Sequence, residues 1–166
     1  MTERIGSAVT TKVLARITGP SGVNAALAAL AQTERTCGGP PDVAQIRVQN
    51  VAMDLAERGS IVQYPTIHVY CEQIVNSMVE KFRTFSGTVQ MAVEVRYSQE
   101  RLEGLQEALE LYSSATTAAL DSNRGDWGDG AFYAGGYKVV FNAVKQGGKN
   151  FMQIAKITFD IGVSKN

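Results

Sequence analysis

One stretch, from Thr88 to Val163, constrains the fold most, because it predicts a strand, a helix and a long hairpin in succession. Its first part alternates between apolar and mostly polar residues, the apolar ones being Val89, Met91, Val93, Val95 and Tyr97. An alternation of period two predicts a strand with one buried face and one face toward water or a partner. A sheet built on this strand has one face for a helix to cover.

A helix and a hairpin are predicted after this strand. Ser98 is placed to cap the helix. Its apolar residues fall at helical spacing: Leu102, Leu105, Leu109 and Tyr112. Two strand-like runs, Tyr137–Val144 and Phe151–Val163, are joined by Lys145-Gln-Gly-Gly-Lys149, which is typical of a hairpin turn. A sheet with one covered face and exposed edges suits assembly at least as well as catalysis.

The first part of the chain predicts two helices. The first has an apolar residue every four positions: Ile5, Val9, Val13 and Ile17. Gly19-Pro20 ends it, and Ser21 can cap an alanine-rich second helix that extends to about Thr33. Alanine side chains bury little area per residue, so we interpret this pair as an arm suited to docking.

The middle of the chain predicts short extended segments. Val43–Val51 resembles a strand, and Ala52–Arg58 a short helical turn. Ile61–Cys71 is extended but contains Pro65, so this strand either lies at an edge or begins after the proline. Glu72–Phe85 fits either a helix or an irregular strand, and we favour the helix.

These elements predict an α+β fold with a mostly antiparallel sheet, helices packed on one face and a long C-terminal β-hairpin. We divide the chain into an N-terminal helical arm, residues 1–42, and an α+β core domain, residues 43–166. A chain of 166 residues is long enough to bury a core without disulfides or metal.

The charge balance argues against nucleic-acid binding as the main activity. Sixteen basic and 16 acidic side chains give a net charge of zero. Nucleic-acid binders usually have a basic excess, since neutralising phosphates drives their affinity. A net charge near zero also removes long-range repulsion between copies, which permits self-association.

The cysteines and the hydropathy predict a soluble cytosolic chain. Cys37 and Cys71 show no metal-ligand spacing, and we expect both to be reduced thiols. The N-terminus lacks the basic start and apolar run of a signal peptide. No stretch approaches the roughly 18 apolar residues of a membrane span.

Residues that could carry chemistry are few. His68 is the only histidine, so a zinc site of the usual kind is not expected, and we assign it a structural role. Asp126 and Asp129 lie in a glycine-rich segment, where two acids alone make a weak calcium site and a turn is the simpler interpretation. We therefore predict no catalytic residue, no cofactor and no metal.

Trp127 is the most informative side chain of that glycine-rich segment. It is the only tryptophan, and Phe132 and Tyr133 follow it closely. Such aromatics either fold back onto the core or anchor a protein–protein interface, where tryptophan and tyrosine are enriched. Our interface candidates are the residues of this segment and of the hairpin tip: Asp126, Trp127, Asp129, Phe132, Tyr133, Lys145 and Lys149.

Several segments between residues 60 and 164 have sequence patterns similar to those of one known family. They are Tyr64-Pro-Thr-Ile-His-Val-Tyr70, Phe82-Arg-Thr-Phe-Ser-Gly87, Val93-Glu-Val-Arg-Tyr-Ser98, Gly135-Gly-Tyr-Lys-Val139 and Asn150–Phe159. Together with the helix after Ser98, they resemble the tail terminator proteins of long-tailed bacteriophages, also called tail-completion or neck proteins.

The resemblance implies a virion protein without enzymatic residues, assembled in the host cytoplasm. It implies a hexameric ring at the head–tail junction that ends the tail tube and joins it to the head connector. The expected partners are copies of the chain, the tail tube protein and a head–tail connector or head-closure protein. DNA would pass through the lumen without specific binding, and no membrane is involved.

Other interpretations stay open. The same pattern fits a different virion component, such as a head-closure protein or a tube subunit. A small cytosolic α+β enzyme or ligand-binding domain is a third interpretation, which the missing catalytic and metal-binding clusters disfavour.

Overall fold

The computed structural model describes residues 4–34, 41–52, 56 and 61–166. The predicted helical turn at Ala52–Arg58 falls largely outside this part of the chain, and Cys37 falls outside it entirely. Cys71 is described and is a free thiol, as expected. Burial raises the pKa of that thiol.

The centre of the fold is a pair of long antiparallel strands, β3 (Phe85–Gln99) and β8 (Asn150–Lys165), which stay in register along their whole length. On one side β2 (Thr66–Asn76) pairs antiparallel with β3, and β1 (Gln45–Val48) pairs parallel with β2. The sheet is therefore mixed but mostly antiparallel.

The other edge of β8 is covered by three short strands placed end to end. They are β7 (Lys145–Gly147), β6 (Lys138–Phe141) and β5 (Ala131–Tyr133). The strand β4 (Gly125–Gly128) then pairs with β5 in a small hairpin. The predicted C-terminal hairpin is confirmed, but its predicted first arm forms only the short strand β6. The first residues of the predicted turn, Lys145–Gly147, form β7 instead, and the chain turns at Gly148 with φ 63°.

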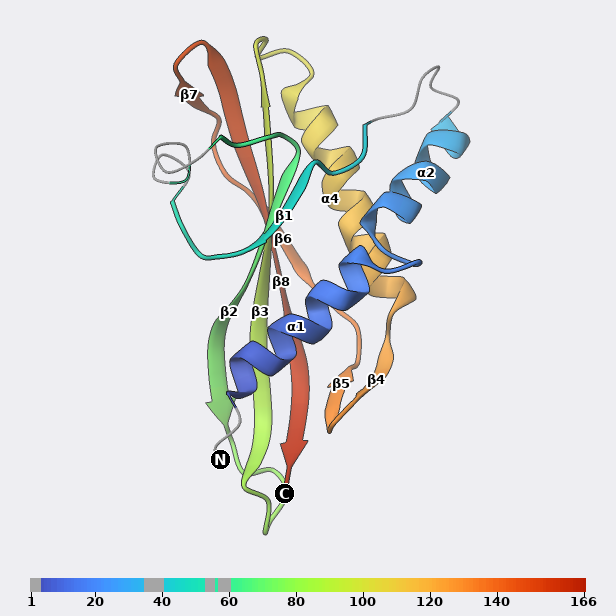
Figure 1. Ribbon diagram of the computed structural model, residues 1–166, viewed down its shortest axis with the longest axis vertical. Coiled ribbons are helices and arrows are strands. Elements are labelled where there is room, and N and C mark those ends of the chain that lie inside the picture. The colour runs from blue at the N-terminus through green and yellow to red at the C-terminus, as the bar shows by residue number, and fades with distance from the viewer. Residues whose placement is uncertain (1–3, 35–40, 53–55, 57–60) are drawn as a thin grey trace.

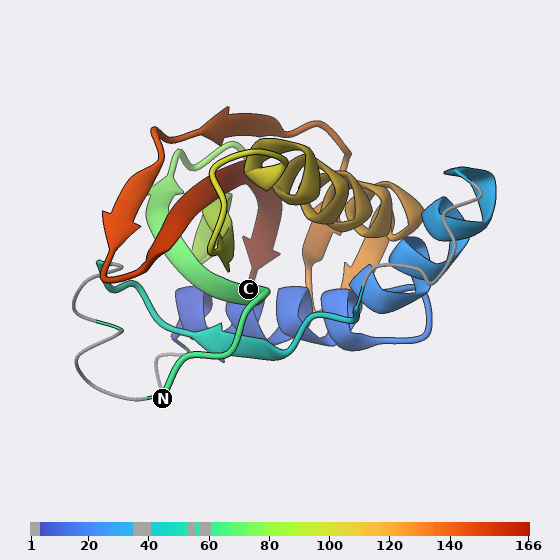
Figure 2. The same ribbon diagram turned by 90° about the horizontal axis from the view of Figure 1, so that it is seen from above.

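The helices α1 (Ile5–Thr18), α2 (Val23–Glu34) and α4 (Leu105–Ser122) complete the fold. The sheet curls, and α1 and α4 lie on the side toward which it curls (Figures 1 and 2). The α+β class, with helices packed on one face of the sheet, is thus confirmed.

The core lies between this face of the sheet and the helices. Alternate residues of β3 stand in register with alternate residues of β8, as in the pairs Met91–Phe159 and Val93–Ile157. All four side chains are buried. In a pleated strand every second side chain points to the same face, so the alternation seen in the sequence places all of them toward the helices.

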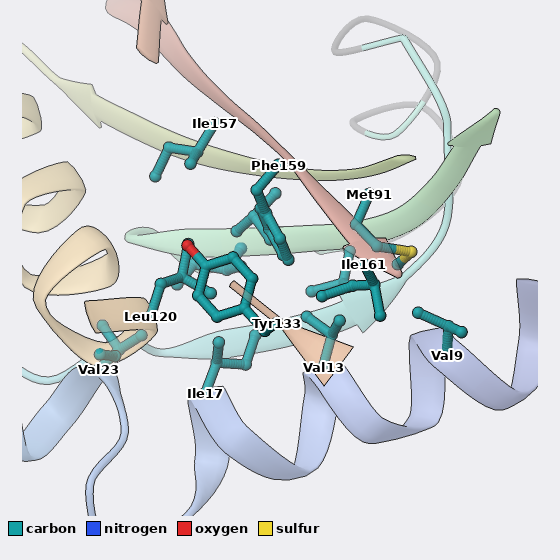
Figure 3. Close-up of a cluster of buried hydrophobic side chains, with 14 of the residues drawn as sticks. Val9, Val13, Ile17, Val23, Met91, Leu120, Tyr133, Ile157, Phe159 and Ile161 are labelled. Atoms are coloured by element: carbon teal, nitrogen blue, oxygen red, sulfur yellow. The ribbon is translucent and has the colours of Figure 1, made fainter. Parts of the chain in front are cut away.

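The two N-terminal helices belong to this same core. Val13 and Ile17 from α1 lie below Tyr133 and Ile161, and Val9 continues the same row (Figure 3). Val23 from α2 lies beside Leu120 of α4 in the same cluster (Figure 3). The arm therefore packs on its own chain rather than projecting from it. Whether residues 1–42 form a domain separate from residues 43–166 stays a prediction.

The helix that we favoured over Glu72–Phe85 is wrong. β2 continues to Asn76, with Ile74 opposite Val89 and Val75 opposite Thr88, and a turn over residues 77–84 leads into β3. The apolar spacing that suggested a helix runs across the end of a strand and into a turn. Gly87 permits the tight approach of the strands, because a Cβ there would overlap the carbonyl oxygen of Val75.

The predicted start of α4 is also wrong. Ser98 is still part of β3, opposite Met152 of β8, and the helix begins at Leu105 after Gly104 in the left-handed conformation (φ 78°). Leu102, expected on the buried helix face, is exposed. The ladder to β8 continues through Gln99 and so outweighs the capping preference of a serine.

Candidate interaction surfaces

Two of the seven interface candidates lie in the core instead. Trp127 is only 6% exposed, and its indole Nε1 donates a hydrogen bond to the carbonyl oxygen of Asn123 at 2.6 Å. Tyr133 is fully buried between Trp127 and Phe159, with ring centroids 5.6 Å from each. Their assignment as contact residues is corrected, because neither side chain is available at the surface of the folded chain.

The two acids of the same hairpin serve local structure. Oδ1 of Asp126 accepts a hydrogen bond from the backbone N–H of Gly128 at 2.8 Å, which forms a turn of the expected kind. Oδ2 of Asp129 lies 2.9 Å from Nζ of Lys12, and that hydrogen bond lowers the pKa of the carboxyl. Among the residues described, no group of three or more potential metal ligands is found.

The remaining candidates are exposed but lie far apart. Phe132 of β5 is 51% exposed near the C-terminal end of β8. Lys145 and Lys149 are exposed on the β7–β8 hairpin, which lies at the opposite end of the molecule (Figure 1). The structure therefore does not bring these three side chains into one surface.

Sequence reasoning missed the most exposed apolar surface, the turn between β2 and β3. This turn, the β2–β3 tip, comprises residues 77–84 at the end of the molecule next to the C-terminus (Figure 1). Phe82 is 100% exposed and Val79 77%, and Met78 is exposed beside them. Met78 and Phe82 have φ values of 49° and 65°, a left-handed conformation that costs free energy for residues of this size.

Hydrogen bonds to Glu80 in the β2–β3 tip and to Asn76 just before it hold the turn in place. Oδ1 of Asn76 accepts hydrogen bonds from the backbone N–H groups of Ser86 at 3.1 Å and Met78 at 3.4 Å. Oε2 of Glu80 accepts hydrogen bonds from Arg83 at 3.0 Å and from Ser164 at 3.1 Å. The tip is thus a fixed turn whose apolar side chains point outward, whereas an ordinary surface loop exposes polar side chains.

A second apolar feature is a groove between α1 and the β1–β2 edge of the sheet, called the α1–β2 groove below. It has a volume of about 420 Å³. Its walls comprise Gly6, Ser7, Thr10, Thr11, Leu14, Val48, Gln49, Tyr70, Cys71 and Ile74. No formally charged side chain is among them, so the groove suits an apolar occupant better than a phosphate or a charged peptide.

The polar atoms of the α1–β2 groove are largely committed to the fold. Oγ1 of Thr10 donates to the carbonyl oxygen of Gly6 at 2.7 Å, and Oγ1 of Thr11 donates to that of Ser7 at 3.0 Å. The hydroxyl of Tyr70 donates to Oε1 of Glu94 at 2.8 Å. Small-molecule sites orient their ligand through a few free polar groups, and these three are engaged elsewhere.

A third apolar surface follows the β6 edge. Tyr137, Val140 and Phe141 are exposed there, on the far side of β8 from β2. β6 pairs with β8 on one side and, within the described residues, has no strand on its other side.

A largely buried ion pair, Arg96 with Glu94, lies on the sheet face opposite the helices. Nη2 of Arg96 lies 2.6 Å from Oε2 of Glu94 and donates to the carbonyl oxygen of Val51 at 2.5 Å. These bonds fasten the chain after β1 across the outer face of β2 and β3. Replacing one member of such a pair costs much free energy, because the other charge stays buried alone.

His68 lies buried beside this ion pair. Its Nε2 is 3.4 Å from Nε2 of Gln49, and its Nδ1 is buried with no hydrogen-bond partner. Burial, reinforced by the positive charge of Arg96, lowers the pKa of His68 to about 4, so the ring is neutral at neutral pH. The carboxylate of Glu94 is occupied by Arg96 and Tyr70, so a proton relay from His68 to Glu94 is not set up.

No protein-family model matches the chain, and no curated protein matches it in sequence. No helix in the described ranges combines the length and apolar character required to span a bilayer.

Proposed function

We propose that the chain is a structural protein of a bacteriophage virion. In this proposal it forms a ring at the head–tail junction, ends the tail tube and joins it to the head connector. The observation that supports this best is the presence of two unlike apolar edges on opposite sides of one sheet.

The first edge is the outer side of β2. β1 pairs with β2 only as far as Val69, so Tyr70–Asn76 has no strand neighbour on that side in the described part of the chain. Ile74 and Val75 are exposed along it. The second edge is β6, with its exposed Val140 and Phe141. Unpaired strand edges are templates for pairing with another chain.

A contact between unlike edges has a geometric consequence. An interface that joins one patch to a different patch on the next copy repeats head to tail, and it closes into a ring where the rotation allows. The two faces of such a ring differ chemically. One face would bind the last ring of the tail tube protein and the other the connector or head-closure protein, as expected for a hexameric terminator.

The charge balance is compatible with this role. A net charge of zero gives copies no long-range repulsion to overcome when they associate. The lumen of the ring would let DNA pass without holding it, since strong retention of DNA requires a basic excess.

The solution mass of the purified chain, measured by light scattering with electron microscopy of the same sample, tests the proposal. We expect a single closed ring of fixed mass. Filaments of stacked rings would favour a tube subunit instead. A monomer at millimolar concentration would contradict the proposal and favour the enzyme or ligand-binding interpretation.

Substitutions on β6 test the proposed contact between the β6 edge of one copy and the β2 edge of the next. Val140→Lys places a charge on the β6 edge and should lower the ring mass, while Lys138→Ala on the same strand removes a charge and should leave the mass unchanged. Both side chains are exposed, so neither substitution should unfold the chain.

A further inference from the structure

The β2–β3 tip and the α1–β2 groove are complementary features of one chain. The tip exposes an apolar knob, Phe82, and the groove is an apolar hollow without charged walls. Phe82 is fully exposed, so it does not fill the groove of its own chain. We propose that Phe82 of one copy docks in the α1–β2 groove of the next copy and anchors the subunit contact.

The strain of the β2–β3 tip supports this proposal. A left-handed phenylalanine is unfavourable, and full exposure of its ring gains nothing for folding. The hydrogen bonds of Asn76 and Glu80 nevertheless hold the turn in this shape. Holding an apolar side chain outward in one conformation reduces the entropy lost when it binds, which is the advantage of preorganisation.

The chemistry of the α1–β2 groove also favours an apolar side chain such as Phe82 as its occupant. Its apolar walls include Leu14, Val48 and Ile74, while its threonine hydroxyls are bonded to their own helix. The phenyl ring of Phe82 has no polar group, so it needs no hydrogen-bond partner in the groove. Phenylalanine buries about 150–250 Å² on docking, so the knob acts as an anchor and neighbouring surfaces supply the rest of a stable interface.

This contact is of the head-to-tail kind. A copy whose tip is bound still offers its own groove to another copy, so the contact repeats. The inference rests on the proposed function in assuming that copies of the chain bind one another, and it adds which residues do so.

Phe82→Asn tests the knob. Asparagine tolerates the left-handed conformation, so the turn keeps its shape while the apolar ring is lost. We expect the concentration at which subunits associate to rise about 30-fold or more, as for the loss of an interface hot spot. The control is Leu102→Asn, which removes another exposed apolar side chain away from both features and should leave association unchanged.

Thr11→Trp tests the groove by filling it from α1. We expect a loss of association of the same size. Thr18→Trp is the matched control, because Thr18 is also exposed on α1 and also donates its hydroxyl to a carbonyl four residues earlier, but it does not line the groove. Thermal unfolding of all four variants should match that of the unaltered chain.

Mixing the two impaired variants gives the sharpest outcome. The Thr11→Trp copy keeps its tip and the Phe82→Asn copy keeps its groove, so the mixture should form 1:1 dimers and nothing larger. Rings of unaltered mass from either single variant would overturn the docking contact while leaving the proposed ring intact. A monomeric unaltered chain would overturn both.

Discussion

At the scale of single residues, Trp127 is the side chain that joins three parts of the core. It contacts Tyr133 of β5, binds the carbonyl of Asn123 after α4, and lies under the guanidinium of Arg16 of α1, 5.5 Å from the ring centroid. We therefore expect Trp127→Ala to lower the free energy of unfolding by about 3–5 kcal/mol, measured by urea denaturation.

Phe132→Ala is the comparison for this substitution. Phe132 is an aromatic of the same hairpin but is half exposed, so its truncation should change stability by about 0.5 kcal/mol or less. If Trp127→Ala were as stable as the unaltered chain, the packing described for this ring would be wrong.

His68 gives a prediction on pH. Its pKa is about 4 in the folded chain against 6.5 for the free side chain, so the unfolded chain binds a proton more readily between these values. The contribution to stability is therefore complete above pH 6.5 and is lost as the pH falls toward 4. The full loss amounts to about 3 kcal/mol.

Urea denaturation across this pH range checks the titration of His68. His68→Gln keeps a polar side chain of similar size that does not titrate, so its stability should fall less steeply between pH 6.5 and 4. Arg96, Glu94 and Arg47 surround the ring and are present in both proteins, so their effects cancel in the comparison. If the stability of both proteins fell equally steeply with pH, the loss of stability could not be assigned to His68.

At the scale of elements, the β2–β3 tip depends on one side chain before the turn. Asn76 accepts hydrogen bonds from two backbone N–H groups, those of Met78 and Ser86. Asn76→Ala should leave global stability within about 1 kcal/mol but free the turn, because neutral hydrogen bonds each contribute about that much or less. Faster amide hydrogen exchange at Ser86 would report the loosening.

Gln73→Ala provides the control for the tip. Gln73 is exposed on β2, and its substitution should leave exchange at Ser86 unchanged. Equal exchange rates in the Asn76→Ala variant and the unaltered chain would mean that the sheet alone shapes the turn.

For the whole molecule, the nature of the subunit contact predicts its response to salt. The side chains that we propose to make the contact, among them Phe82, Val140 and Phe141, are exposed and apolar, and the net charge is zero. Raising the ionic strength from about 0.1 M to about 1 M shortens the Debye length from about 10 Å to about 3 Å, which weakens contacts between surface charges. Light scattering at both salt concentrations should therefore give the same ring mass.

The opposite salt response would identify a different interface. Dissociation at high salt would mean that charge pairs hold the copies together. Lys145 and Lys149 on the β7–β8 hairpin, with the acidic side chains of a neighbour, would then be the contacts to substitute first.

Much of the fold was predictable where the periodicity was unbroken. The apolar residues of α1 at every fourth position and the alternation along β3 each extend over several repeats, so one element explains the whole pattern. Prediction was wrong over Glu72–Phe85, because a strand end and a turn together imitated helical spacing. Nothing local distinguishes the two, since only the ladder to β3 decides.

The candidate surfaces were less predictable than the fold. Trp127 and Phe132 lie in the same short hairpin, yet one ring is buried and the other exposed, because burial depends on Asn123, Tyr133 and α1 rather than on the hairpin itself. The exposure of Phe82 could not be predicted from the sequence, since the residues around it fit the buried face of a helix equally well.

The sequence alone determined the identity of the long elements and the face each one buries, because hydrophobic periodicity is set by residues close together in the chain. Only the tertiary structure decided which strand edges lack neighbours, which aromatics reach solvent, and that the arm closes over its own sheet. These outcomes depend on contacts between residues far apart in sequence, such as α1 with β5 and β8, and no local pattern encodes them.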